Sequence, residues 1–478
     1  MKVMAMTYKM RMLEVHRRAL RELFADMTRE QACFLVCGAA KASEDETILL
    51  VREVIALGPG DLRVHAPDQL SVEPSAMLRV ARRAKELGGS VCMVHTHPMC
   101  AGWVEFSDAD DYGNQRTFEF FTRMLPGQPN SCLVWDSTLD CVQGRVYTSP
   151  SSWRPIQWVE VVSGVRRIVH NSRAAPSQDA VQVEEQFDRQ ARLLGKEGQQ
   201  CLGKLRGGII GCGGIGSLAA VLCIHSGIED LVLVDYDKVS TTNLPRLIGA
   251  TPSDVGMPKV EVARRYLSAH RPGARIETAQ VPVEQSSLLP SLASLDFVIC
   301  GTDDTTSRAY LNQLCHQYYV PVLDLGVQFA ADPITESLVK EVGRANLMLP
   351  GTPCMICSGQ IDPQQLQAEG LPPSEREKRW REGYVTGVDV TEPSMMVFNM
   401  QVAARGLQNL IAWATGLVPA SENEMELFRF LGLGGAEPGM RRVRRREMQA
   451  CPICSEASHV LGTGDLTGML VAPRPEHR

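Results

Sequence analysis

Two histidines separated by a single residue, His95 and His97, end an apolar stretch that is typical of a buried strand. On an extended segment both imidazoles can turn toward one cation, and Asp110, on the helix expected next, can supply a third ligand. Three protein ligands leave one coordination position for water, which is typical of catalytic zinc sites. Such a site needs a general base, and Glu30, at the start of the first apolar strand, is the candidate.

These residues resemble the JAMM (JAB/MPN) metalloproteases, whose pattern is a strand-borne Glu, then His-x-His-Pro, then Ser-x-x-Asp. The resemblance implies zinc bound by His95, His97 and Asp110, Glu30 as general acid and base, and Ser107 supporting the oxyanion. Asp110 follows His97 by 13 residues, about two more than the family pattern predicts, so the third ligand has alternatives. Asp108 fits the usual distance but lacks a Ser three residues before it, so we favour Asp110 and keep Asp108 and Asp111 as alternatives.

A second group of residues indicates nucleotide binding. An apolar strand at residues 208–210 runs into a loop with Gly211, Gly213 and Gly216, and a helix and a second strand that ends at Asp235 follow. Glycines let backbone N–H groups approach a phosphate, and the acid after the second strand can bind a ribose hydroxyl. This unit alone is compatible with either NAD or ATP.

The residues after Asp235 favour ATP. Asp237, Asn243, Arg246 and Lys259 form a polar and cationic series that suits a triphosphate better than a hydride carrier. When a carboxylate attacks the α-phosphorus of ATP, the products are an acyl-adenylate and pyrophosphate, and cations must offset the charge on the phosphates. Arg246 and Lys259 are suited to that task.

Residues 184–415 resemble the ThiF/MoeB and ubiquitin-activating superfamily, in which an aromatic-x-Arg-Gln opening, here Phe187 to Gln190, precedes the ATP loop. Gly301-Thr302-Asp303-Asp304 and Gly256-x-x-Lys259 continue the match. The resemblance implies the following contacts with ATP: Asp235 with the ribose, and Asn243, Arg246 and Lys259 with the phosphates. It also implies that Arg189 reaches the γ-phosphate across a dimer interface and that Asp303 binds Mg²⁺, whereas we expect Arg308 to pair within the fold.

Two CxxC pairs, Cys354 with Cys357 and Cys451 with Cys454, can each offer two thiolates to one tetrahedral ion. The activating superfamily splits a structural zinc site in this way, so we predict one closed site that attaches the end of the chain to the adenylation domain.

The segment between Cys357 and Cys451 contains no cysteine, although ubiquitin-activating enzymes usually carry a nucleophilic cysteine there. Direct transfer of the activated carboxylate to a partner is the preferred interpretation. The alternatives are a hydroxyl of Thr386, Thr391 or Ser394, or a cysteine outside the segment.

Composition narrows the class of partner. The chain has 478 residues, of which 44% are hydrophobic, and a formal net charge of -6. Its overall charge therefore does not favour binding to nucleic acid or to an anionic membrane. The basic run at 441–446 is expected to be solvated. Fifteen cysteines, no leader-like N-terminus and no long apolar run predict a cytoplasmic protein with reduced thiols.

The order of elements predicts an α/β protein of two domains. We expect a JAB/MPN-type α/β domain at 1–150, a linker at 151–183, and a doubly wound, Rossmann-like ThiF domain at 184–420. Strands are predicted at 208–210, 231–234, 297–300 and 321–324. Residues 421–478 are expected to complete the zinc site and to end in a tail.

Together these motifs predict a bifunctional enzyme of a bacterial-type ubiquitin-like modification pathway, which uses ATP, Mg²⁺ and one catalytic and one structural Zn²⁺. One domain would adenylate the C-terminal glycine of a small β-grasp protein, and the other would cleave or trim such proteins. A conjugating-enzyme-like acceptor and a homodimer through the adenylation domain are expected. Activation and trimming of a sulfur-carrier protein is the alternative, and a catalytically dead scaffold is an alternative of another class.

Overall fold

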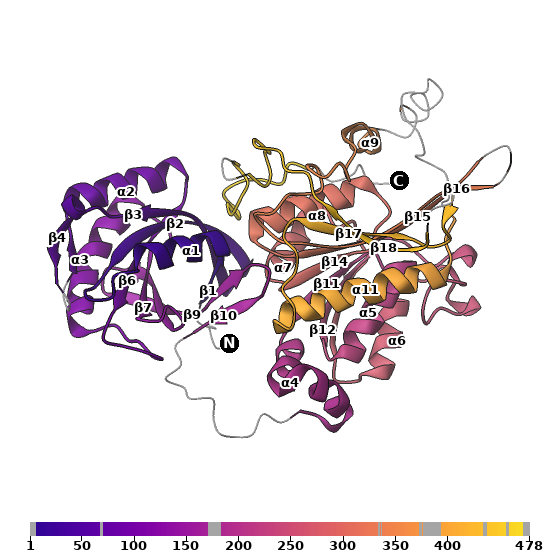
Figure 1. The fold of residues 1–478 in the computed structure, drawn as a ribbon, viewed down its shortest axis with the longest axis horizontal. Helices are drawn as coiled ribbons and strands as arrows, with labels where there is room; N and C mark the ends of the chain where they lie inside the picture. Colours follow the sequence, from indigo (N-terminus) through magenta and orange to yellow (C-terminus); the bar gives the residue numbers. More distant parts are fainter. Residues whose placement is uncertain are drawn as a thin grey trace. The chain divides into compact units, whose positions relative to one another are not determined.

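The computed structural model describes residues 6–66, 70–170, 183–332, 335, 337–371, 375, 393–433, 437–455 and 458–471. The chain divides into two compact units, which Figure 1 shows as ribbons. Unit 1 comprises Met1–Ala180, Gln317–Tyr319 and His459–Gly468, and unit 2 comprises Val181–His316, Val320–Ser458 and Met469–Arg478.

Unit 1 is built on an eight-stranded sheet in the order β1-β3-β2-β6-β7-β8-β9-β10. Strand β1 also pairs with β9, so the sheet closes on itself into a barrel-like form. The strands are β1 (Thr7–Leu13), β2 (Ala32–Ser43), β3 (Glu46–Ala56), β6 (Ser90–His97), β7 (Ser131–Asp136), β8 (Val142–Ser149), β9 (Ser152–Val162) and β10 (Arg167–Val169). The helices are α1 (Glu14–Leu23), α2 (Pro74–Glu86) and α3 (Asp108–Met124), and β4 (Leu62–His65) pairs with β5 (Leu70–Val72) as a separate ribbon.

Alternate residues of β2 lie in two different hydrophobic cores of unit 1. Cys33 and Leu35 belong to a core inside the closed sheet, whereas Phe34 and Val36 pack with Val80 of α2 and other apolar residues on the opposite face. This follows from the two-residue period of a strand, because both faces of β2 are covered. The continuous apolar run that predicted a buried strand is therefore explained.

The predicted linker at 151–183 is wrong in its first part. Strands β9 and β10 lie within it, and β9 pairs with both β8 and β1. The Ser- and Pro-containing stretch that suggested a linker forms the turn between Ser149 and Ser152, which are paired residues of a hairpin. The sheet of unit 1 therefore extends past residue 150 to Val169.

Unit 2 contains an eight-stranded sheet in the order β13-β12-β11-β14-β15-β16-β17-β18. Strands β11 (Arg206–Ile210), β12 (Asp230–Val234), β13 (Arg275–Ala279), β14 (Phe297–Cys300) and β15 (Val322–Ala331) are parallel, and β16 (Leu338–Met348), β17 (Glu424–Arg429) and β18 (Gly439–Arg444) are antiparallel. The predicted doubly wound arrangement and its four strands are thus confirmed. The strand order reverses between β11 and β14, and ligands of such sheets bind at the carboxyl ends of the strands at that point.

The helices of unit 2 connect these strands. They are α4 (Asp188–Gly203), α5 (Gly214–Ser226), α6 (Lys259–His270), α7 (Leu289–Ala293), α8 (Thr305–Tyr318), α9 (Pro363–Glu369) and α11 (Met396–Thr415). Figure 1 shows α11 beside α5, and α11 also packs on β15 and β16.

The predicted boundary at 420 is also wrong. Strands β17 and β18 lie beyond it, yet they extend the sheet of unit 2 through β16. The stretch His459–Gly468 belongs to unit 1, where Gly464 forms a bridge with Ala39 of β2. Short strands with a weak alternation, such as Glu424–Arg429, gave too little periodic signal to predict this pairing.

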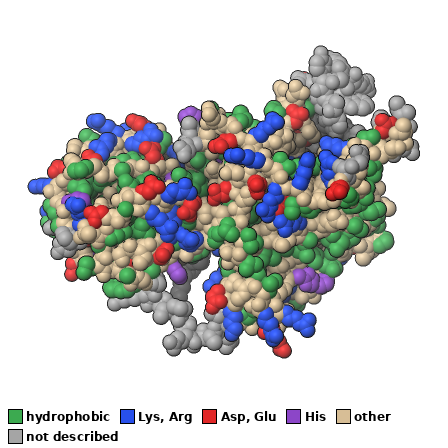
Figure 2. All heavy atoms as spheres, in the orientation of Figure 1, with side chains coloured by type: hydrophobic (Ala, Val, Ile, Leu, Met, Phe, Trp, Pro, Cys, Tyr) green, Lys and Arg blue, Asp and Glu red, His purple; other side chains and the backbone are tan. Residues whose placement is uncertain are grey.

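The face drawn in Figure 2 carries basic and acidic side chains interspersed, which agrees with the small net charge. Within the described residues, no helix is long and apolar enough to cross a membrane.

Candidate functional site

The glycine loop joins the carboxyl end of β11 to the first turn of α5. Gly211 has a φ of +85°, which an L side chain rarely adopts. A Cβ on Gly216 would lie 1.7 Å from the carbonyl oxygen of Gly211, so only glycine fits there. A Cβ on Gly213 would meet nothing within 4 Å. The loop therefore turns tightly beside β11 and leaves open space at Gly213, where backbone N–H groups can approach a phosphate.

Asp235 fixes the loop from the end of β12. Its carboxylate accepts hydrogen bonds from the backbone N–H of Cys212 at 2.7 Å and from the backbone N–H of Asp237 at 2.8 Å. Burial raises the pKa of Asp235, and the charge of Lys259 opposes that rise. The predicted ribose-binding acid thus lies beside the glycine loop, as a nucleotide site requires.

Lys259, the first residue of α6, is the best-placed cation of the site. Its ammonium group lies 2.7 Å from the carboxylate of Asp237. Burial lowers the pKa of Lys259, but the charges of Asp235, Asp237 and Asp303 outweigh burial, so the net pKa is raised. Lys259 is therefore charged at neutral pH, and the three carboxylates stabilise that charge.

Arg246 and Asn243 lie on the segment between β12 and α6, and Arg246 approaches the glycine loop. A Cβ on Gly214 would lie 3.3 Å from Cδ of Arg246, so the arginine stem passes close to the loop. The guanidinium donates to the carbonyl oxygen of Thr242 at 3.1 Å. Asn243 accepts from the backbone N–H of Ser240 at 3.1 Å, so its amide oxygen holds the local turn.

The remaining two predicted nucleotide residues are exposed. Asp303 follows β14, at the carboxyl edge of the sheet where the strand order reverses. Arg189 lies on the first turn of α4. Neither has an ion pair or hydrogen bond within the described part of the chain, so both side chains are available to a ligand or a second subunit.

Asn399 of α11 is a residue of this site that sequence reasoning missed. It is buried, and its side-chain nitrogen would be 2.6 Å from a Cβ on Gly214. It also donates to the hydroxyl of Ser394 at 3.3 Å. Because α11 lies almost two hundred residues from the glycine loop in sequence, no local pattern could have predicted this approach. Two of the alternative acyl acceptors, Thr386 and Thr391, lie outside the described residues.

Unit 1 brings His95, His97 and Asp110 together at the end of β6 and the start of α3. Their ligand atoms all lie within 4.8 Å of one another. Nε2 of His95 is 3.0 Å from one carboxylate oxygen of Asp110, and Nε2 of His97 is 3.2 Å from the other. Both ring nitrogens of His95 are buried, and apart from the approach of Nε2 to Asp110 neither has a polar partner within the described residues. Buried imidazole nitrogens whose polar neighbour is a carboxylate are suited to a metal ion.

The structure distinguishes Asp110 from its alternatives. Asp108 is exposed on the first turn of α3, and Asp111 forms an ion pair with Arg145. Asp110 is held by Ser107, whose backbone N–H and hydroxyl both donate to it, at 2.7 and 2.8 Å. Burial raises the pKa of Asp110, but hydrogen bonds from His95 and His97 outweigh it and lower that pKa strongly. Ser107 thus caps α3 and orients Asp110 here.

Glu30 precedes β2 and is nearly buried. Its carboxylate lies 3.8 Å from Nε2 of His97. The pairing of Ala32 with His95 between β2 and β6 brings the residue to this end of the sheet. Burial lowers the pKa of His97, and the charges of Asp110 and Glu30 outweigh burial and raise it. The predicted base is therefore beside the three candidate ligands.

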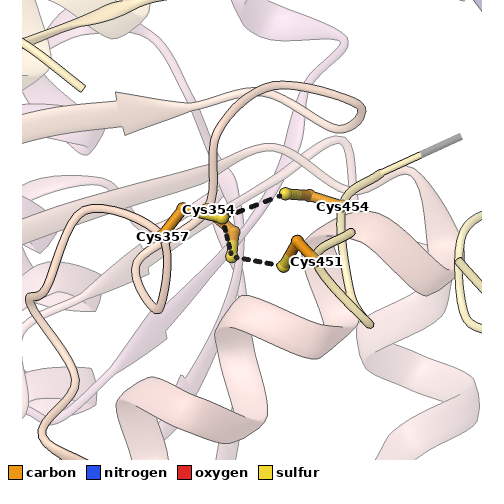
Figure 3. A group of neighbouring side chains, drawn as sticks. All are labelled: Cys354, Cys357, Cys451 and Cys454. Atoms are coloured by element: carbon orange, nitrogen blue, oxygen red, sulfur yellow. Dashed lines mark hydrogen bonds between the residues drawn. The ribbon is translucent and has the colours of Figure 1, made fainter. Parts of the chain in front are cut away.

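The four CxxC cysteines converge on one point of unit 2, as Figure 3 shows. Sγ of Cys354 lies 3.7 Å from Sγ of Cys357 and 3.6 Å from Sγ of Cys451, and Sγ of Cys357 lies 3.6 Å from Sγ of Cys454. In a tetrahedral site with Zn–S bonds of about 2.3 Å the sulfur atoms are about 3.8 Å apart. The cluster, which is buried, therefore has the size that a zinc ion needs.

Residues 187–452, more than half of the chain, match the sequence model of the ThiF family. The chain belongs to this family. The match includes the glycine loop, Asp235, Arg246, Lys259, Asp303 and three of the four CxxC cysteines. It does not include the residues of unit 1 that precede 187.

Individual members of the ThiF family are similar over shorter stretches. The SAMP-activating enzyme E1 of Haloferax volcanii is 29% identical over 177 residues, which are 36% of this chain and 62% of that protein. The molybdopterin-synthase adenylyltransferase of Escherichia coli is 34% identical over 139 residues, 29% of this chain and 56% of that protein. Ubiquitin-like modifier-activating enzyme 5 of Drosophila willistoni is 30% identical over 183 residues, 34% of this chain and 42% of that protein. The chain thus spans less than two thirds of each of these relatives.

Among solved structures, E. coli MccB with ATP aligns with 19% identity and a TM-score of 0.45, covering 57% of this chain and 75% of that one.

Proposed function

We propose that unit 2 adenylates the C-terminal carboxylate of a protein substrate. The observation that carries this proposal is the position of Lys259, which is charged and held by Asp237 beside the glycine loop. Membership of the ThiF family supports it, as do the names of the relatives, which are activating enzymes or adenylyltransferases.

The chemistry follows from the charges of the site. A substrate carboxylate attacks the α-phosphorus, the bond to the bridging oxygen breaks, and pyrophosphate leaves with the electron pair. Lys259 and Arg246 offset the charge on the phosphates, and the N–H groups of the glycine loop bind phosphate oxygens. Asp235 binds the ribose. Mg²⁺ bound by Asp303 would neutralise phosphate charge.

We further propose that unit 1 is a zinc-dependent peptidase of the JAMM type. His95, His97 and Asp110 would hold the ion, and the bound ion would polarise a carbonyl and lower the pKa of water. Glu30, whose carboxylate lies 3.8 Å from Nε2 of His97, would accept and return the proton. Ser107 orients Asp110 through two hydrogen bonds, so its first role is to fix a ligand. The four cysteines of unit 2 would hold a second, structural zinc.

A substrate that suits both units is a small β-grasp protein that ends in glycine. One unit would activate its carboxylate and the other would cleave the bonds made with it or trim its precursor. We therefore propose a bifunctional, cytoplasmic enzyme of a bacterial-type ubiquitin-like modification pathway, which acts as a homodimer in which Arg189 reaches the partner's ATP. A conjugating-enzyme-like protein would receive the activated carboxylate.

One observation favours a second function, the activation of a sulfur-carrier protein. No cysteine lies between Cys357 and Cys451, so a carrier thioester on that segment is not available. One relative is named "Molybdopterin-synthase adenylyltransferase". Another, from Aedes aegypti, is named "Adenylyltransferase and sulfurtransferase MOCS3". In this function unit 1 would trim residues beyond the terminal glycine.

Exchange of ³²P-pyrophosphate into ATP tests the adenylation directly. The probe is a glycine-ended β-grasp protein encoded beside the gene for this chain, with the same protein lacking its last glycine as the control. We expect exchange only with the intact probe and Mg²⁺. Exchange without any protein substrate, or with the truncated probe alone, would reject the proposal. Cleavage of a C-terminal extension from the same probe, blocked by a chelator, tests unit 1.

A further inference from the structure

Asp303 is followed by the first turn of α8, and that turn is held by a residue from far along the chain. Glu369, the last residue of α9, accepts hydrogen bonds from the backbone N–H of Thr305 at 3.0 Å and from that of Thr306 at 2.8 Å. The hydroxyl of Thr306 donates to the same carboxylate at 2.7 Å. One carboxylate thus binds two of the N–H groups that a helix start leaves without intrahelical partners.

A second contact holds the other side of Asp303. Arg308 of α8 donates to the carbonyl oxygen of Thr302 at 2.6 Å, and its Nε lies 3.4 Å from the carboxylate of Asp324 on β15. Asp324 is fully buried and also pairs with Arg344 at 2.5 Å. The backbone is therefore fixed immediately before Asp303 by Arg308 and two residues after it by Glu369.

The rest of the connection between β16 and α9 is attached to the same helix. Asn312 accepts from the backbone N–H of Met355 at 2.8 Å, and Nδ1 of His316 accepts from that of Gly351 at 3.1 Å. Hydrogen bonds thus attach the segment 351–369 to α8 at three positions, through Gly351, Met355 and Glu369. The contact of Glu369 is the one at the start of α8, next to Asp303. The carboxylate of Glu369 is held in place by the segment as well as by α8.

We propose that Glu369 is a positioning residue for the magnesium site of Asp303. By fixing the N–H groups of Thr305 and Thr306, it holds the start of α8 and so sets where the Asp303 carboxylate meets a cation bound to ATP. Asp303 itself is exposed, and its charge acts on Lys259 and Arg308, so the backbone on either side contributes to its orientation. This inference rests on the proposed function, because it assumes that the site binds ATP with a divalent cation.

The test uses the full chain and needs no protein substrate. Binding of Mn²⁺ in the presence of ATP is followed by electron paramagnetic resonance, and ATP binding without divalent cation is measured separately. We expect Glu369→Ala to weaken Mn²⁺ binding by about tenfold, as is typical when a residue that orients a metal ligand is removed. ATP affinity without the cation should remain unchanged. Glu369→Gln, which keeps one acceptor oxygen, should bind Mn²⁺ with an affinity between those of Glu369→Ala and the unaltered chain.

Gln367→Ala is the matched control, because Gln367 is exposed on the same helix. It should bind Mn²⁺ as the unaltered chain does. Equal Mn²⁺ binding by Glu369→Ala and Gln367→Ala would overturn the proposal. So would a uniform loss of thermal stability and of cation-free ATP binding in Glu369→Ala and Glu369→Gln, since that is the result of a purely structural role. If the unaltered chain binds no ATP, the proposed function itself fails, and the ATP measurement identifies that case.

Discussion

The carboxylate of Asp235 accepts a hydrogen bond from the backbone N–H of Cys212 at 2.7 Å. This contact ties the end of β12 to the middle of the glycine loop. In the proposed function the ribose would bind beside this carboxylate, whose orientation the loop sets.

The first prediction concerns two glycines of this loop. Gly216→Ala places a Cβ 1.7 Å from the carbonyl oxygen of Gly211, so the backbone must shift and the protein should lose several kcal/mol of stability, about 3 or more. Gly213→Ala meets no atom within 4 Å, so its melting temperature should be unchanged. It should nevertheless weaken ATP binding, because the added methyl group occupies the open space over the loop. Calorimetric unfolding and ATP titration of both variants check this, and normal ATP binding by Gly213→Ala would contradict it.

The second prediction concerns metal content. The purified chain should carry two zinc ions that differ in lability. His95→Ala should lose one ion and the peptidase activity while melting normally. Cys354→Ser should lose the other ion and melt at a lower temperature, because a closed Cys₄ site contributes to folding. Elemental analysis with thermal unfolding distinguishes the two, and an unchanged zinc content in His95→Ala would remove the metal site from unit 1.

The third prediction concerns acid stability. Burial in unit 1 lowers the pKa of His16 to about 4, and its ring nitrogen Nδ1 accepts the backbone N–H of Leu13. Because the folded pKa lies below the unfolded value of about 6.5, the stabilisation is complete above pH 6.5 and is lost as the pH falls toward 4. The free energy of unfolding should fall with a slope approaching about 1.4 kcal/mol per pH unit from this residue alone.

Denaturant unfolding at several pH values checks this slope. His16→Gln should reduce the slope between pH 6.5 and 4 by that amount. His225→Gln, at an exposed position, is the control and should leave the slope unchanged. An equal slope in His16→Gln and the unaltered chain would show that His16 does not bind the proton.

The fourth prediction is that no thioester forms on this protein. Every cysteine is buried except Cys100 and Cys201, which are half-buried. Cys212, inside the glycine loop, is fully buried, and burial together with the charge of Asp235 raises its pKa well above the usual value. Denaturing gels after incubation with ATP and the β-grasp probe should therefore show no adduct that a reductant removes. A reductant-sensitive band that disappears in Cys100→Ser or Cys201→Ser would contradict the prediction, whereas an adduct that only hydroxide removes would indicate an ester on a hydroxyl.

The sequence predicted those parts of the fold and site that depend on local patterns. Four of the five parallel strands follow from short apolar runs, whereas β13 was not predicted. The approach of His95, His97 and Asp110 follows from a strand and a capped helix close in sequence. Arg308 was expected to pair within the fold, and it does so with Asp324.

What could not be predicted depends on contacts between residues distant in sequence. Asn399 reaches Gly214 across the packing of α11 on α5, and Glu369 reaches Thr305 from a helix that starts after the first CxxC pair. The linker was predicted incorrectly because a Ser-Pro-Ser stretch is equally typical of a hairpin turn, and only the pairing of Ser149 with Ser152 distinguishes the two.

Adenylation by unit 2 is tested most directly by the intact mass of the β-grasp probe after incubation with this chain and Mg·ATP. We predict a fraction of the probe heavier by one adenylate group on its terminal glycine, when the reaction is quenched in acid. Lys259→Ala should lose more than about 2 kcal/mol of transition-state stabilisation, so its adenylate should form at least tenfold more slowly. Arg264→Ala, on the exposed side of the same helix, should form it normally. A probe of unchanged mass in the presence of the unaltered chain would exclude adenylation by unit 2, and equal adenylation by Lys259→Ala would exclude the role of Lys259.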